Sequence, residues 1–145
     1  MQLKRGDKMD IKKEKLEELF FHALQASKNS YSPYSKFPVG AAILTEDGVE
    51  YTGCNVENRS YGLTNCAERT AVFKAVSEGH RRIAAVAIAA PKADYPVGPC
   101  GACRQVLTEF GQNDVPVIFG SKIENCKVKT LGELYPFDSL HELAD

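Results

Sequence analysis

The chain has 145 residues, the size of one ordinary domain, and its 43% hydrophobic and 26% charged residues exclude the disordered, fibrous and disulfide-rich secreted classes. Its 18 Lys plus Arg and 19 Asp plus Glu give a net charge of −1, which provides no general attraction to nucleic acid or anionic lipid. The longest apolar run is too short for a membrane span, and residues 1–10 lack the apolar segment of a signal peptide. We therefore expect a cytoplasmic protein that binds neither nucleic acid nor membrane, with a flexible arm over residues 1–10 and a single domain over residues 11–145.

Hydrophobic periodicity and turn residues predict helices and strands that mostly alternate. In chain order they predict a helix over 11–30, strands over 39–44 and 49–55, a helix over 66–78, a strand over 83–90, a helix over 100–110, strands over 115–119 and 126–130, and a short helix over 131–134. Gly79 and Gly111 are predicted to end the second and third helices. The run over 83–90 has no polar alternation, as expected for a strand with helices on both faces.

The lengths of the connections predict how the strands pair. The strand, helix, strand order over residues 83–119 implies a parallel pair with a right-handed crossover. The segment 120–125 is shorter than the dozen or so residues that a parallel crossover needs, so the strand over 126–130 should be antiparallel to its neighbour. We expect a three-layer α/β/α fold around a mixed five-stranded sheet whose last strand is antiparallel.

Three of the five cysteines fall at predicted helix starts, where the helix dipole and free amides favour thiolates. Cys100 and Cys103 are three apart and share a helix face, so they can bind one ion, and Cys66 can complete three sulfur ligands. Three protein ligands leave open the fourth position that is typical of a catalytic zinc, whose bound water has a pKa of about 7. The spacing predicts one Zn²⁺ per chain. Cys54 and Cys126 are interpreted as buried small hydrophobic residues.

The alternative is a structural zinc site, closed by a fourth Cys or His, in a module that mediates binding. Glu68 favours a catalytic zinc site over a structural one, because a carboxylate two residues after Cys66 can lie beside the open position and transfer a proton. Alone, such a Glu is more often a first-turn residue that complements the helix dipole. Combined with Pro99-Cys100-Gly101-Ala102-Cys103, it matches the signature of zinc deaminases.

From about Tyr31 to Pro136, the sequence resembles the homotetrameric zinc-dependent cytidine deaminases of the three-cysteine type. The stretches that carry the resemblance are Phe37-Pro38-Val39-Gly40-Ala41-Ala42, Gly53-Cys54-Asn55-Val56-Glu57-Asn58, Cys66-Ala67-Glu68-Arg69-Thr70-Ala71 and Pro99-Cys100-Gly101-Ala102-Cys103-Arg104-Gln105-Val106. The resemblance implies a homotetramer with shared active sites. It also implies hydrolysis of cytidine and 2′-deoxycytidine to the uridines and ammonia in pyrimidine salvage. In that reaction zinc hydroxide attacks C4, and Glu68 is the catalytic residue that carries the water's proton to N3 and protonates the leaving amine.

The resemblance also implies a set of residues that bind the substrate. Asn55 and Glu57 hydrogen-bond the ribose hydroxyls, Phe37 packs on the pyrimidine, Tyr61 completes a neighbouring subunit's pocket, Phe137 reaches across to cover the base, and Ala67 lies beside the substrate. By themselves, Asn and Glu two apart on an extended segment point the same way and offer a donor and an acceptor. The alternative interpretations are an Asx-type loop cap for this pair and a core position for Phe37.

Two arginines are candidates for balancing the negative charge of the zinc site. Three thiolates and Zn²⁺ sum to −1, so a positive charge is expected nearby. Arg69 follows Glu68, Arg104 follows Cys103, and a guanidinium can donate to a thiolate without displacing it from the metal. The alternative is that both are surface residues, and the resemblance favours Arg69.

Two related activities remain as rivals. A blasticidin-type nucleoside deaminase resembles the chain around both cysteine motifs but lacks the pair seen here as Asn55 and Glu57. A nucleic-acid-editing deaminase is disfavoured by the net charge of −1 and by the antiparallel last strand. The structural zinc-binding interaction module is the rival from a different class.

Overall fold

The computed structural model describes residues 11–143, so the arm expected at residues 1–10 lies outside the described residues. The elements are α1 Lys13–Ser27, β1 Gly40–Thr45, β2 Glu50–Cys54, α2 Ala67–Ser77, β3 Ile83–Ala89, α3 Gly101–Phe110, β4 Pro116–Gly120, β5 Lys127–Thr130 and α4 Leu131–Leu134. Every predicted helix and strand is present, with shifts of a few residues at the ends. Three short 3₁₀ turns, Tyr61–Leu63, Ile123–Asn125 and His141–Leu143, were not predicted.

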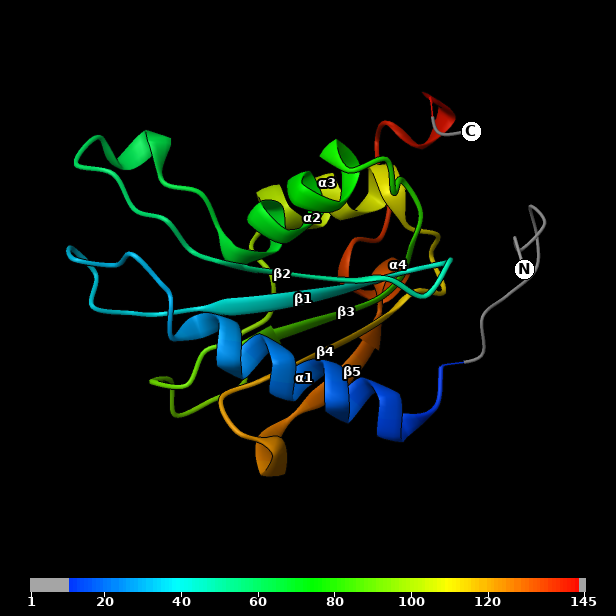
Figure 1. Ribbon diagram of the computed structural model, residues 1–145. Helices are drawn as coiled ribbons and strands as arrows, with labels where there is room; N and C mark the ends of the chain where they lie inside the picture. Colours follow the sequence, from blue (N-terminus) through cyan, green and yellow to red (C-terminus); the bar gives the residue numbers. More distant parts are fainter. Residues whose placement is uncertain (1–10, 144–145) are drawn as a thin grey trace.

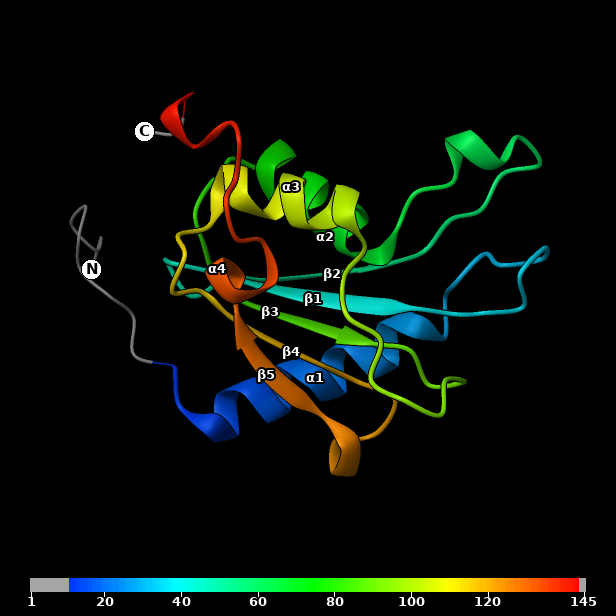
Figure 2. The same ribbon diagram turned by 180° about the vertical axis from the view of Figure 1, so that it is seen from behind.

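The strands form one sheet in the order β2-β1-β3-β4-β5. β3 and β4 are parallel, whereas β4 and β5 are antiparallel, with Pro116 opposite Thr130. Helix α1 covers one face of the sheet, and α2 and α3 lie side by side on the other (Figures 1 and 2). The three-layer fold, the mixed sheet and its antiparallel last strand are therefore confirmed.

The alternation of side chains along the central strands divides the core between the two faces. On β1, Ala41 and Ile43 join the cluster beneath α2 and α3, whereas Ala42 and Leu44 join the cluster beneath α1. Every residue of β3 is buried, as predicted for a strand covered on both faces. Full burial of one such Ile or Leu side chain contributes about 1.5 to 3 kcal/mol. The two clusters therefore hold the helices firmly against the sheet.

Glycines mark two helix ends and one close contact between layers. Gly79 follows α2 with φ +95°, a left-handed conformation that glycine adopts without strain. Gly111 also ends its helix, but with an extended φ of −126°. A Cβ at Gly53 would lie 2.6 Å from the Ala71 nitrogen and 2.8 Å from the Ala67 oxygen, so β2 lies directly against the backbone of α2.

Two loops project together from the same side of the sheet, one over residues 28–39 and one over residues 55–66 (Figures 1 and 2). Backbone bridges pair Tyr31 with Val56 and Val56 with Asn65. The second loop leads directly into α2, so it connects the end of β2 to the first cysteine. Within residues 11–143, no helix is both long enough and apolar enough to cross a membrane.

Candidate active site

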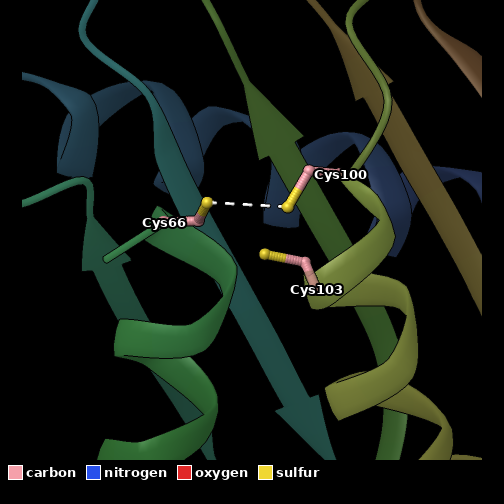
Figure 3. Close-up of side chains that lie close together, drawn as sticks. All are labelled: Cys66, Cys100 and Cys103. Carbon is pink, nitrogen blue, oxygen red and sulfur yellow. Dashed lines mark hydrogen bonds between the residues drawn. The ribbon is translucent and has the colours of Figure 1, made fainter. Parts of the chain in front are cut away.

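Three cysteines meet where α2 and α3 begin. The sulfurs of Cys66, Cys100 and Cys103 all lie within 4.8 Å of one another, and those of Cys66 and Cys100 are 3.7 Å apart. Figure 3 shows the three side chains converging from the two helix starts. Cys66 and Cys100 are the N-cap residues of α2 and α3, but neither side chain makes a capping hydrogen bond. Their sulfurs are therefore free to serve as metal ligands.

The spacing and charge of the sulfurs fit Zn²⁺. Two sulfurs at about 2.3 Å from a tetrahedral ion lie about 3.8 Å apart, close to the separation of Cys66 and Cys100. A hydrogen bond from Cys103, aided by the Arg69 guanidinium, lowers the pKa of the Cys66 thiol to about 5. The same hydrogen bond to Cys66, with burial, raises the pKa of the Cys103 thiol. Without a cation, a second thiolate beside the first is thus unfavourable, because the two negative charges repel each other. A bound metal ion would remove this penalty.

Glu68 lies in the first turn of α2, two residues after Cys66, and only 4% of it is exposed. Burial, with the charge of Cys66 adding to it, raises the pKa of the Glu68 carboxyl. A buried carboxyl beside the sulfurs is suited to receiving and returning a proton. Ala67, between Cys66 and Glu68, is fully buried in the same turn.

The two arginines make different contacts. Arg69 donates from Nη2 to the Cys66 sulfur at 3.2 Å, and its Nε is buried with no hydrogen-bond partner among the described residues. Arg104 donates from Nε to the Pro99 carbonyl at 2.7 Å and from Nη1 to the Leu134 carbonyl at 2.6 Å. The structure therefore places Arg69 against a candidate ligand, whereas Arg104 joins the start of α3 to the end of α4.

Asn55 is buried at the end of β2, and its amide organises the first loop. Its Oδ1 accepts from Ser30 Oγ at 2.5 Å and from the Val39 backbone N–H at 2.9 Å. Its Nδ2 donates to the Phe37 carbonyl at 2.9 Å and has a second N–H to offer. These contacts fix the orientation of the amide.

Glu57 also bonds to the loop over residues 28–39. Its Oε1 accepts from the backbone N–H groups of Tyr34 and Ser35 at 3.0 and 3.1 Å, and its Oε2 accepts from Ser35 Oγ at 2.5 Å. The Ser35 hydroxyl is the main cause that lowers the pKa of the Glu57 carboxyl. Ser35 Oγ also accepts from the Phe37 N–H at 3.0 Å. One network therefore joins Asn55, Glu57 and the half-buried Phe37.

Sequence reasoning missed Ser30 and Ser35, which complete this network. Both are hydroxyl residues in a loop that also holds Pro33, and nothing in their spacing distinguishes them from ordinary turn residues. Only the fold, which brings residues 28–39 beside residues 55–66, reveals their acceptors.

Two further predicted residues lie on the surface of the chain. Tyr61 is 74% exposed, and its ring makes an edge contact with Tyr34 at a centroid distance of 5.9 Å. Phe137 is completely exposed and has a left-handed φ of 57°. The structure does not bring Phe137 into contact with the cysteine cluster within one chain.

The two remaining cysteines differ from expectation, because Cys54 and Cys126 are only partly buried. Cys54 is the last residue of β2, and Cys126 comes directly before β5, where it packs at the edge of the cluster beneath α1. Burial, with the charges of Glu17 and Glu124, raises the pKa of the Cys126 thiol to about 11. Neither belongs to the sulfur cluster.

Comparison with known proteins identifies the family. Residues 13–119 match the family model described as the cytidine and deoxycytidylate deaminase zinc-binding region. The chain belongs to this deaminase family. A cytidine deaminase from Sporosarcina psychrophila is 50% identical over 121 residues, covering 83% of this chain and 88% of the relative. The crystal structure of a cytidine deaminase from Burkholderia pseudomallei matches with a TM-score of 0.79 and 45% identity over 83% of this chain and 96% of that chain.

A more distant relative bears on the rival activity. A blasticidin-S deaminase from Bacillus cereus is 34% identical over 83 residues, covering 52% of this chain and 59% of that protein.

Membership of the deaminase family, together with the three-cysteine cluster, establishes a zinc-dependent hydrolytic deaminase with one Zn²⁺ per chain. Family membership therefore disfavours the alternative that the cysteines form a purely structural zinc site.

Proposed function

We propose that this protein hydrolyses cytidine and 2′-deoxycytidine to uridine and 2′-deoxyuridine, releasing ammonia, as a step of pyrimidine salvage. The observation that carries the proposal is the buried Glu68 carboxyl, which lies in the same helical turn as Cys66 beside a three-sulfur cluster. The net reaction adds one water across the C4–amine bond: oxygen becomes the C4 carbonyl, and the amine leaves as ammonia.

Glu68 performs the proton transfers of this reaction. It takes one proton from the attacking water and passes it to N3 of the pyrimidine, and it then takes the proton of the new C4 hydroxyl and delivers it to the departing amine, so that the C4 carbonyl forms as the C4–N bond breaks. Zn²⁺, when bound by Cys66, Cys100 and Cys103, supplies the Lewis acidity that makes water nucleophilic near neutral pH. Arg69 offsets the negative charge of the sulfur ligands through its bond to Cys66.

The loop network holds the nucleoside. The second N–H of Asn55 donates to a sugar hydroxyl, and the Glu57 carboxylate accepts from one, so a free hydroxyl satisfies both groups. The Phe37 side chain packs on the pyrimidine, and its backbone is held at both the N–H and the carbonyl. Ala67 lies beside the substrate in the turn that carries Glu68.

The active enzyme is a homotetramer with shared active sites. Support comes from two aromatic side chains that the single chain leaves exposed, Tyr61 and Phe137. In the tetramer Tyr61 completes a neighbour's pocket and Phe137 covers its base. A cytoplasmic location suits the five free cysteines, and a net charge of −1 favours a free nucleoside over nucleic acid as substrate.

Ammonia release from cytidine tests the proposal. The zinc-loaded protein should turn over cytidine and 2′-deoxycytidine, and far less cytidine 5′-monophosphate or blasticidin S. Glu68→Gln should keep its zinc and lower kcat by at least about 10² to 10⁴, because the carboxyl acts in two proton transfers. Glu109→Gln, which alters an exposed carboxylate on α3, serves as the matched control.

Near wild-type kcat in Glu68→Gln would refute the mechanism. Absence of cytidine turnover by the zinc-loaded wild type would refute the function. Faster turnover of blasticidin S than of cytidine would favour the rival deaminase, against which the Asn55 and Glu57 pair argues.

A further inference from the structure

We propose that Ser35 is a positioning residue for sugar recognition, which orients the Glu57 carboxylate so that one acceptor site faces the nucleoside hydroxyl. The inference rests on the proposed function, because it concerns the same nucleoside pocket. Ser35 makes three polar contacts in this network: its N–H and its hydroxyl both donate to Glu57, and its Oγ accepts from the Phe37 N–H.

The hydrogen bonds to Glu57 are distributed unevenly over its two carboxylate oxygens. Each carboxylate oxygen accepts about two hydrogen bonds. Oε1 of Glu57 already accepts two, from the Tyr34 and Ser35 backbone. Oε2 accepts one, from the Ser35 hydroxyl at 2.5 Å. The remaining acceptor site is therefore on Oε2, and the Ser35 hydroxyl determines in which direction it points.

The backbone of this loop has an unusual conformation beside Ser35. Lys36, between Ser35 and Phe37, has a left-handed φ of 56°, which a residue with a side chain seldom adopts. Its N–H donates to the Ser32 carbonyl at 3.0 Å, which closes the turn. This unusual conformation lets Ser35 Oγ contact the Glu57 carboxylate and the Phe37 N–H together. Strained backbone of this kind persists where surrounding contacts hold it, and it is enriched at ligand sites.

Because Ser35 is exposed, a role in positioning Glu57 can be distinguished from a role in packing the core. Ser35 is exposed, so removal of its hydroxyl leaves no cavity in the core. Phe37 retains the bond from Asn55 Nδ2 to its carbonyl when Ser35 Oγ is lost. Phe37, which is proposed to stack on the base, thus keeps one hydrogen bond. Oε2 of Glu57 has no hydrogen-bond donor other than Ser35 among the described residues. Loss of the Ser35 hydroxyl should therefore weaken recognition of the sugar more than stacking on the base.

The test compares two substrates that differ only in the sugar. Ser35→Ala should lower kcat/KM for cytidine about tenfold, the loss expected of one hydrogen bond to a charged group. For 2′,3′-dideoxycytidine, which offers no hydroxyl to Glu57, the same change should alter kcat/KM by no more than about twofold to threefold. Ser35→Thr, which keeps a hydroxyl, should restore most of the activity on cytidine. Ser77→Ala, at the exposed end of α2, is the control serine.

Zinc content and the thermal midpoint are measured for each variant. Ser35→Gly removes the same hydroxyl and replaces Ser35→Ala if that variant does not fold. Equal losses on both nucleosides would overturn the positioning role in favour of a general structural one, and an unchanged kcat/KM for cytidine would overturn it outright. A wild type that turns over neither nucleoside would refute the proposed function itself, which separates that failure from a failure at Ser35.

Discussion

Gly53→Ala should weaken both the stability and the turnover of the enzyme, because β2 and α2 touch at this glycine. The new Cβ would lie 2.6 Å from the Ala71 nitrogen, 2.8 Å from the Ala67 oxygen and 3.0 Å from the Thr70 Cβ. Two of these atoms belong to the helix backbone and cannot rotate away. To restore ordinary contact of about 3.4 Å, the first turns of α2 must move by roughly 0.6 to 0.8 Å.

The magnitude follows from two separate effects of this movement. Overpacking of a well-packed interior costs about 1 to 3 kcal/mol. In a chain of this size, that loss lowers the thermal midpoint by roughly 3 to 12 °C. The moving turn also carries Cys66 and Glu68 relative to the pair on α3, and misplacement of catalytic groups by under 1 Å costs about 10- to 100-fold in kcat.

Differential scanning fluorimetry and cytidine turnover, both on zinc-quantified protein, measure the two effects. Gly62→Ala is the matched control, because a Cβ there meets nothing within 4 Å, and its thermal midpoint should stay within about a degree of the wild type. A Gly53→Ala protein with wild-type midpoint and kcat would refute the close-contact argument. A lower midpoint with unchanged kcat would show that the strain is absorbed away from the first turn of α2.

Two further predictions concern the metal and the pH dependence of stability. Cys100→Ala should abolish stoichiometric zinc, whereas Cys126→Ala should keep one zinc per chain in elemental analysis; zinc loss in the latter alone would refute the three-sulfur set. Burial raises the pKa of Glu50, but its bonds to Lys15 and His22, each 2.6 Å long, outweigh burial and lower the pKa overall. These two bonds to the Glu50 carboxylate therefore stabilise the fold above the unfolded pKa of about 4.5, and this contribution is lost as the pH falls through the lower folded value. Glu50→Gln should be less stable than the wild type at pH 7, by about 0.5 to 1 kcal/mol, and the gap should narrow as the pH falls below 4.5 and through the lower folded pKa; a gap that does not change with pH would contradict this.

The fold could be predicted largely from the sequence because its signals are local or depend on length. The continuous apolar run of β3 indicates burial on both faces, and the short connection after β4 permits only an antiparallel β5. Helix ends were less certain. Gly79 adopts the left-handed conformation of a helix terminus, whereas Gly111 is extended. Gly111 instead fits a narrow space, because a Cβ there would lie 3.3 Å from the Leu107 oxygen and from the Leu131 side chain.

The cysteine cluster could be predicted because Cys100 and Cys103 are fixed relative to each other by one helical turn. The arginines show the limit of such local reasoning. Arg69 and Arg104 each follow the first residues of a helix, yet only Arg69 contacts a candidate ligand. Arg104 instead finds carbonyls at Pro99 and at Leu134, thirty residues further along the chain. Sequence spacing contains no information about that distant acceptor.

The groups proposed for catalysis and those proposed for substrate recognition lie in different parts of this molecule. The sulfurs and Glu68 occupy the starts of two helices packed on a rigid sheet, so their geometry is set by the core. The groups proposed to bind the nucleoside lie on two loops whose mutual position depends on the side-chain bonds of Asn55 and Glu57. A substitution in these loops can therefore alter which sugar is accepted while the metal site keeps its shape. We expect a relative whose name indicates a different substrate, such as the blasticidin-S deaminase, to differ from this chain mainly in the loops.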